Sequence, residues 1–185
     1  LFDYFIFDAV YFEKNFDVKK NDDHLILVGC SPCQYYSIIN TDHTKAELSK
    51  DLLMSFARFI EYYAPGYILV ENVPGIVTNK DTILPKFLKK IEKLGYKHKE
   101  EIVDMSQYGV PQSRRRFSLI ATRLDGVELR MPVKSNDVLT VADVLGERNG
   151  FSRIAAGHKD KSEFQHTVAG LNNVSLQRMA LTPHN

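Results

Sequence analysis

The feature that most constrains the fold is an alternation of short apolar runs with a longer stretch of helical periodicity. Residues 25–28 (LILV) and 67–70 (YILV) are continuous apolar runs, which are typical of strands buried on both faces of a sheet. Between them, apolar residues recur every three or four positions from Leu48 to Tyr63, as they do on one face of an amphipathic helix. This order of strand, helix and strand predicts an α/β fold.

The same rhythm continues along the chain. Apolar residues between positions 83 and 94 have helical spacing and stop before Gly95, a residue type favoured just after a helix. Residues 97–104 and 117–122 have the composition of strands. Strands that alternate with helices predict a mostly parallel sheet, which binds its ligands beyond the carboxyl ends of its strands. We therefore expect the chemistry of this chain just after the two apolar runs.

Composition narrows the class of protein. With 185 residues, of which 44% are hydrophobic, the chain is long enough for one globular domain or for one domain and part of a second. It has two cysteines and no secretory signal pattern, so we predict a cytoplasmic protein with reduced thiols. No apolar run reaches the roughly 20 residues of a membrane helix, so we expect no membrane partner. The net charge of +1 does not by itself indicate a nucleic-acid partner.

Both cysteines lie in the segment GCSPCQ, residues 29–34, directly after the first apolar run. A structural zinc site commonly needs four ligands, and the sequence has no second cysteine pair, so we predict no metal site. Three interpretations remain: a redox dithiol, a single nucleophilic cysteine, or two buried small hydrophobic residues. Cys33, which follows Pro32, suits a nucleophile better than Cys30, which we expect to be packed at the end of the strand.

Charged residues end the second apolar run and precede the last predicted strand. Glu71 follows the apolar run directly, and desolvation there favours the protonated form, which can donate a hydrogen bond or a proton. The alternative is a strand-end glutamate paired with a lysine. An extended segment would place Gln112, Arg114 and Arg116 on one face, where guanidinium groups can bind phosphates or base carbonyls. The alternative for this segment is a basic sheet edge exposed to solvent.

Taken together, PCQ (32–34), ENV (71–73) and Q-x-R-x-R (112–116), in this order and at these spacings, resemble the motifs of the cytosine-5 DNA methyltransferase family. The resemblance spans roughly residues 15–123. It implies a Rossmann-like methyltransferase fold, S-adenosyl-L-methionine as the methyl donor, and a cytosine flipped out of double-stranded DNA.

The resemblance also implies a role for each candidate residue. Cys33 would attack C6 of the cytosine as a thiolate, because the ring is otherwise too unreactive to accept a methyl group at C5. Glu71 would bind the N3 and amino edge of the base, and Arg116, with Arg114, would hold the base carbonyl, the phosphate and Glu71. The residues expected to bind the cofactor are Asp17, Val18, Pro32 and Leu52, and those expected to contact DNA are Gln34, Ser37, Asn72 and Gln112.

The resemblance divides the chain into two predicted regions. Residues 1–124 match part of the catalytic core, although the glycine-rich F-x-G-x-G loop that normally opens this core is not seen. Residues 125–185 are predicted to form the transition to a smaller target-recognition region, and residues 166–185 resemble the start of that region in a bacterial subset. Ser49 departs from the family pattern, because many relatives carry an arginine there, at the end of a mobile catalytic loop.

We therefore predict a monomeric DNA (cytosine-5)-methyltransferase of bacterial or phage restriction-modification type, which acts on double-stranded DNA beside a separate cognate endonuclease. The alternatives are a transfer-RNA cytosine-5 methyltransferase of the same family, a catalytically silent DNA-binding relative or fragment, and a thiol redox protein that uses both cysteines. The redox alternative leaves Glu71 and the arginines without a role.

Overall fold

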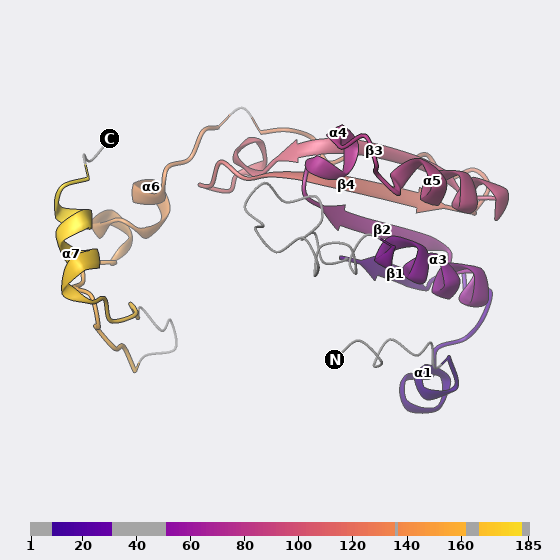
Figure 1. Cartoon of the computed structure of the whole chain (residues 1–185), viewed down its shortest axis with the longest axis horizontal. Helices are drawn as coiled ribbons and strands as arrows, with labels where there is room; N and C mark the ends of the chain where they lie inside the picture. The colour runs from indigo at the N-terminus through magenta and orange to yellow at the C-terminus, as the bar shows by residue number, and fades with distance from the viewer. Residues whose placement is uncertain (1–8, 31–50, 136, 162–166, 183–185) are drawn as a thin grey trace. The chain divides into compact units, whose positions relative to one another are not determined.

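The structure is a computed structural model that describes residues 9–30, 51–135, 137–161 and 167–182 (Figure 1). The chain divides into two compact units, Leu1–Asp137 and Val138–Asn185. In the part of the chain that the structure describes, no helix is long and apolar enough to cross a membrane.

The first unit is built around a four-stranded sheet in the order β1-β2-β4-β3. Its strands are β1 (Ile26–Gly29), β2 (Tyr67–Asn72), β3 (Lys97–Asp104) and β4 (Arg115–Thr122). β1 and β2 are parallel, whereas β4 is antiparallel to both β2 and β3. The prediction of an α/β fold is confirmed. The prediction of a mostly parallel sheet is wrong for the described strands, of which only β1 and β2 pair in parallel.

The antiparallel pair of β3 and β4 results from the short connection between them. A parallel crossover needs about a dozen or more residues and usually a helix, whereas residues 105–114 contain only the 3-10 helix η1 (Met105–Tyr108). Gly109, with a φ of 74°, turns the chain, and the backbone N–H of Met105 donates to the carbonyl of Arg114 at 2.9 Å. β4 therefore returns beside β3 and lies between it and β2.

In the described part of the first unit, three helices cover one face of this sheet. They are α3 (Leu52–Tyr63), α4 (Gly75–Thr78) and α5 (Leu84–Lys93). Alternate strand residues such as Ile68 and Val70 pack on this face against buried helix residues such as Ile60 and Phe87. As predicted, α5 ends before Gly95, which has a φ of 87°. The residues between the packed ones, in β2 and β4, therefore point to the opposite face of the sheet.

The helix α1 (Ala9–Phe16) packs against α3 in the first unit. The rings of Phe12 and Phe59 meet edge to face, with their centroids 6.0 Å apart. The hydroxyl of Tyr62 donates to Oε1 of Glu13 at 3.1 Å. An aromatic contact and a hydrogen bond thus join the two helices.

The described residues of the second unit contain three short helical segments. They are α6 (Val141–Leu145), the 3-10 helix η2 (Glu147–Asn149) and α7 (Asn173–Ala180). Thr140 and Asp143 form a reciprocal capping box at the start of α6, and the side chain of Asn172 accepts a hydrogen bond from the N–H of Ser175 at the start of α7. Local hydrogen bonds therefore define where both α-helices begin.

Candidate functional site

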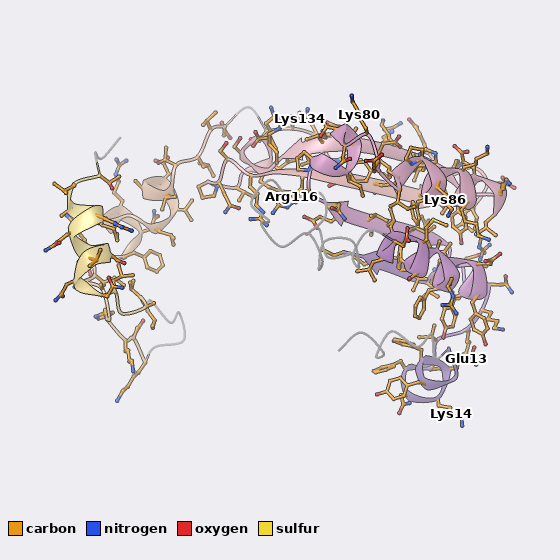
Figure 2. All side chains as sticks on the ribbon, in the orientation of Figure 1. Glu13, Lys14, Lys80, Lys86, Arg116 and Lys134 are labelled. Atoms are coloured by element: carbon orange, nitrogen blue, oxygen red, sulfur yellow. The ribbon has the colours of Figure 1, made fainter. Side chains whose placement is uncertain are left out.

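An ion pair between Glu71 and Arg116 lies on the face of the sheet opposite the three helices. Glu71 pairs with Ser118 of β4 in the register, and Arg116 lies two residues before Ser118 on the same face. Nε of Arg116 is 2.8 Å from Oε1 of Glu71, and the two side chains are 18% and 40% exposed. Figure 2 shows Arg116 near the start of β4. The structure thus brings together two of the predicted catalytic residues, and the partner of Glu71 is an arginine, not a lysine.

Cys30 contacts the second oxygen of the same carboxylate. Its Sγ donates to Oε2 of Glu71 at 2.9 Å, and the residue is exposed. The expectation that Cys30 is packed at the end of the strand is therefore wrong. A signal for this contact was present in the sequence, because residues 26, 28 and 30 alternate along the first run as 67, 69 and 71 do along the second. Parallel pairing of the two runs puts Cys30 beside Glu71.

The predicted nucleophile Cys33 lies outside the described residues, and so do Pro32, Gln34 and Ser37. Their roles stay predictions. The sequence places Cys33 three positions after Cys30, whose thiol contacts Glu71.

Gln112 and Arg114 precede β4 and do not belong to it. The backbone N–H of Gln112 donates to the carbonyl of Val110 at 2.7 Å, and that of Arg114 donates to the carbonyl of Gln112 at 3.0 Å. These successive turns replace the extended segment predicted from residue 112 onwards, so the regular alternation begins only at Arg115. Both side chains are exposed, and the predicted roles of Gln112 and Arg114 stay predictions.

Asn72 follows Glu71 in β2 and therefore lies on the helix-covered face of the sheet. It is 1% exposed, and its Oδ1 accepts a hydrogen bond from the backbone N–H of Val73 at 2.9 Å. The structure does not bring Asn72 together with Glu71 on the open face. Its buried amide instead fixes the chain where β2 ends.

The described residues that are predicted to bind the cofactor come from two places in the first unit. Asp17 follows α1 with a φ of 50°, and its exposed carboxylate is 3.4 Å from Nζ of Lys19. Val18 is half-buried beside it, and Leu52 is the half-buried first residue of α3. A carboxylate that can accept hydrogen bonds from hydroxyl groups and two half-buried apolar side chains are of the chemical types that suit a nucleoside. The assignment stays a prediction.

A groove of about 750 Å³ opens on the same face of the sheet as Glu71. Its floor includes Leu69 and Ile120, which pair across β2 and β4, and it reaches Ser118, the register partner of Glu71. Met131 and Val133 form part of its wall. An apolar groove therefore lies close to the carboxylate.

The arrangement combines a fixed carboxylate with charge-assisted hydrogen-bond donors. Each oxygen of Glu71 accepts one hydrogen bond, from Arg116 or from Cys30, and each retains a second lone pair. Such a carboxylate can bind the hydrogen-bonding edge of a planar ring. Among the described residues, no group of three or more His, Cys, Asp or Glu side chains is arranged to hold a metal ion.

The fold and this site define a class of protein: an α/β domain that presents a glutamate and an arginine at the edge of its sheet where parallel strands end. The family model for C-5 cytosine-specific DNA methylases matches residues 6–178. The chain belongs to the C-5 cytosine-specific DNA methylase family. The prediction of this family is confirmed.

Two curated relatives illustrate the similarity. The chain is 32% identical over 161 residues to the type II methylase M.HgiDII of Herpetosiphon aurantiacus, and the aligned region covers 86% of this chain and 44% of the relative. It is 37% identical over 106 residues to the type II methyltransferase M1.BsuMI of Bacillus subtilis, and that aligned region covers 57% of this chain and 24% of the relative. The chain therefore spans less than half the length of these relatives.

Solved structures agree with this fold. A protein assigned as a DNA modification methyltransferase, encoded within a prophage of Escherichia coli, superposes with a TM-score of 0.61 at 27% identity. That match covers 84% of this chain and 42% of the solved chain. The methyltransferase EhMeth of Entamoeba histolytica, with a TM-score of 0.52 at 16% identity, shares the fold over 75% of this chain and 42% of its own.

Proposed function

We propose that this chain is part of a DNA (cytosine-5)-methyltransferase of a restriction-modification system, which methylates a cytosine flipped out of double-stranded DNA. The observation that carries the proposal is the ion pair of Glu71 and Arg116, in which two motifs far apart in the sequence meet at one sheet edge at 2.8 Å. Family membership and the type II methylases among the relatives support it.

In the proposed reaction, the thiolate of Cys33 forms a bond to C6 of the cytosine, and the ring electrons become available at C5. Glu71 accepts a hydrogen bond from the amino group of the base and supplies a proton to N3, and thereby fixes the orientation of the base. Arg116 holds the carboxylate of Glu71 and stabilises the charge that develops on the ring during the attack. Once C5 carries the methyl group, a base removes the C5 proton, the electrons of that C–H bond break the bond from C6 to sulfur, and Cys33 leaves as a thiolate as 5-methylcytosine forms.

S-adenosyl-L-methionine, when bound, supplies the methyl group for this reaction. Asp17, Val18 and Leu52 would hold it, together with Pro32, which lies outside the described residues. The exposed carboxylate of Asp17 and the half-buried side chains of Val18 and Leu52 fit its ribose and its base in chemical type.

The partners follow from the same proposal. Double-stranded DNA is the substrate, Gln34, Ser37 and Gln112 contact it, and a separate endonuclease would cut the unmethylated site. We further propose that residues 1–124 belong to the catalytic core, that residues 125–185 lead into target recognition, and that the enzyme acts as a monomer in the cytoplasm.

Bisulfite sequencing of DNA from cells that express the complete gene tests the proposal. We expect 5-methylcytosine in one short sequence context and its loss in the variant Cys33→Ser, whereas Cys30→Ser keeps most of it. Equal loss from both cysteine variants would contradict a single nucleophile. Absence of 5-methylcytosine from cells that contain folded protein would contradict the proposed activity.

A further inference from the structure

The carboxylate of Glu71 is held at both of its oxygens. Arg116 donates from Nε to Oε1 at 2.8 Å, and Cys30 donates from Sγ to Oε2 at 2.9 Å. The arginine comes from β4 on one side of β2, and the cysteine follows β1 on the other side. The two donors therefore hold the carboxylate from opposite sides.

The backbone fixes the position of Cys30. Gly29 pairs with Val70 in the parallel register, so the next residue of each strand, Cys30 and Glu71, come side by side. Gly29 is buried, and a Cβ at this position would lie 2.7 Å from the ring of Phe56 in α3. Because a Cβ here would force the ring of Phe56 to shift, Gly29 lets the end of β1 pack closely on α3, and Cys30, the next residue, points away from the helices.

We propose that Cys30 is a positioning residue, whose thiol hydrogen bond orients the carboxylate of Glu71 for the base. The inference rests on the proposed function. With one oxygen bound to Arg116 alone, the carboxylate could still rotate about its terminal bond, which has a broad energy profile. The second donor restricts that rotation and leaves one lone pair on each oxygen, one for the amino group of the base and one for the proton shared with N3. Cys30 acts only through Glu71 and need not touch the base.

A series of variants in the complete gene product tests this role. Cys30→Ala removes the donor, whereas Cys30→Ser keeps one. We expect the single-turnover rate of methyl transfer to fall about three- to tenfold in Cys30→Ala. In Cys30→Ser the rate should lie within about twofold of the wild-type rate. The Kd for DNA should stay unchanged in both variants. Val28→Ala, an exposed position on the same face of β1, is the matched control and should change neither quantity.

Equal single-turnover rates in the alanine and serine variants would overturn the proposal. A defect of Cys30→Ala that raises the Kd for DNA and leaves the single-turnover rate unchanged would also overturn it.

A spectroscopic measurement tests the contact without any methyl transfer. In the 185-residue chain with the variant Cys33→Ser, Cys30 carries the one remaining sulfhydryl, since this sequence has two cysteines. Its S–H stretching band should lie at the lower frequency of a hydrogen-bonded thiol and should move to higher frequency when Glu71→Ala is added. Glu128→Ala, which removes an exposed carboxylate paired with Arg130, should leave the band in place.

An S–H band that stays at the same frequency when Glu71→Ala is added would contradict the contact between Cys30 and Glu71, whatever the activity of the protein. A shifted band in Cys33→Ser, combined with a folded wild-type protein that transfers no methyl group, would instead contradict the proposed function. The two failures are therefore distinguishable.

Discussion

The two units of the chain are stabilised in different ways. Every hydrophobic residue that is buried among the described ones lies between Leu53 and Ala121, in the first unit. In the second unit, apolar residues such as Val138 and Leu181 are more than 80% exposed, and the helices begin at side-chain caps. The comparison teaches that burial fixes the region that carries Glu71 and Arg116, whereas local hydrogen bonds shape the region that follows.

The largest expected effect is the loss of a core side chain. Phe87 of α5 is fully buried against the sheet, so Phe87→Ala should lower the free energy of unfolding by about 3–5 kcal/mol in urea denaturation. Leu176→Ala, at a 42% exposed position of α7, should change it by less than about 0.5 kcal/mol. Similar losses from both variants would show that the second unit has a core of its own.

Removal of the guanidinium of Arg116 tests whether the chemistry belongs to the first unit. Arg116→Ala should reduce the single-turnover rate by about 10²- to 10³-fold, because the developing charge loses a fixed donor, with little change in non-specific DNA binding. Arg130→Ala is the matched control, since Arg130 forms an exposed ion pair with Glu128. A defect in Arg116→Ala that is confined to binding and varies strongly with salt would mark Arg116 as a phosphate contact instead.

The capping box of α6 gives a smaller effect that should stay local. Thr140→Ala removes a hydrogen bond to the backbone N–H of Asp143 and should cost about 1 kcal/mol of helix stability. Hydrogen exchange should become faster in residues 141–145 and remain unchanged in β2 and β4. Faster exchange in the sheet would show that the two units are energetically coupled.

The smallest expected effect is a pH dependence of the first unit. His98 of β3 lies between Glu100, at 2.7 Å, and Glu92, at 3.0 Å. Burial lowers the pKa of His98, but the hydrogen bonds and charges of Glu92 and Glu100 together outweigh burial and raise the pKa above the ordinary 6.5. The imidazolium is therefore favoured in the folded state.

The sign of this dependence follows from linkage. A raised folded-state pKa stabilises the protein fully below the ordinary pKa of histidine, and the stabilisation is lost as the pH rises through the folded value. Urea unfolding at about pH 5.5 and about pH 8.5 should show a difference of less than about 1 kcal/mol that His98→Gln removes. A stability difference that persists in His98→Gln would assign the pH dependence to other groups.

The sequence was sufficient to predict the four described strands and the helices α3 and α5 of the first unit, because burial imposes the periodicities of 2 and 3.6 residues on those segments. It did not predict strand direction. The apolar pattern of residues 117–122 is the same whichever way the strand runs, and the direction depends on the ten-residue link before it, which is too short for a crossover.

Part of the candidate site could also be read from the sequence. The meeting of Glu71 and Arg116 was predicted from their motifs, whereas the contact of Cys30 with Glu71 was not. The second contact depends on the register of two parallel strands, in which Gly29 faces Val70. Periodicity gives the face of each residue, but only the paired structure gives the register.

Covalent trapping tests the central claim most directly. DNA that contains 5-fluorocytosine at the methylated site, incubated with the complete gene product and the methyl donor, should form an adduct that survives denaturing electrophoresis, because fluorine cannot leave as a proton does. Peptide mass spectrometry should place the adduct on Cys33, and Cys33→Ser should give none. Absence of an adduct with a preparation that methylates ordinary DNA, or an adduct on Cys30, would contradict the account.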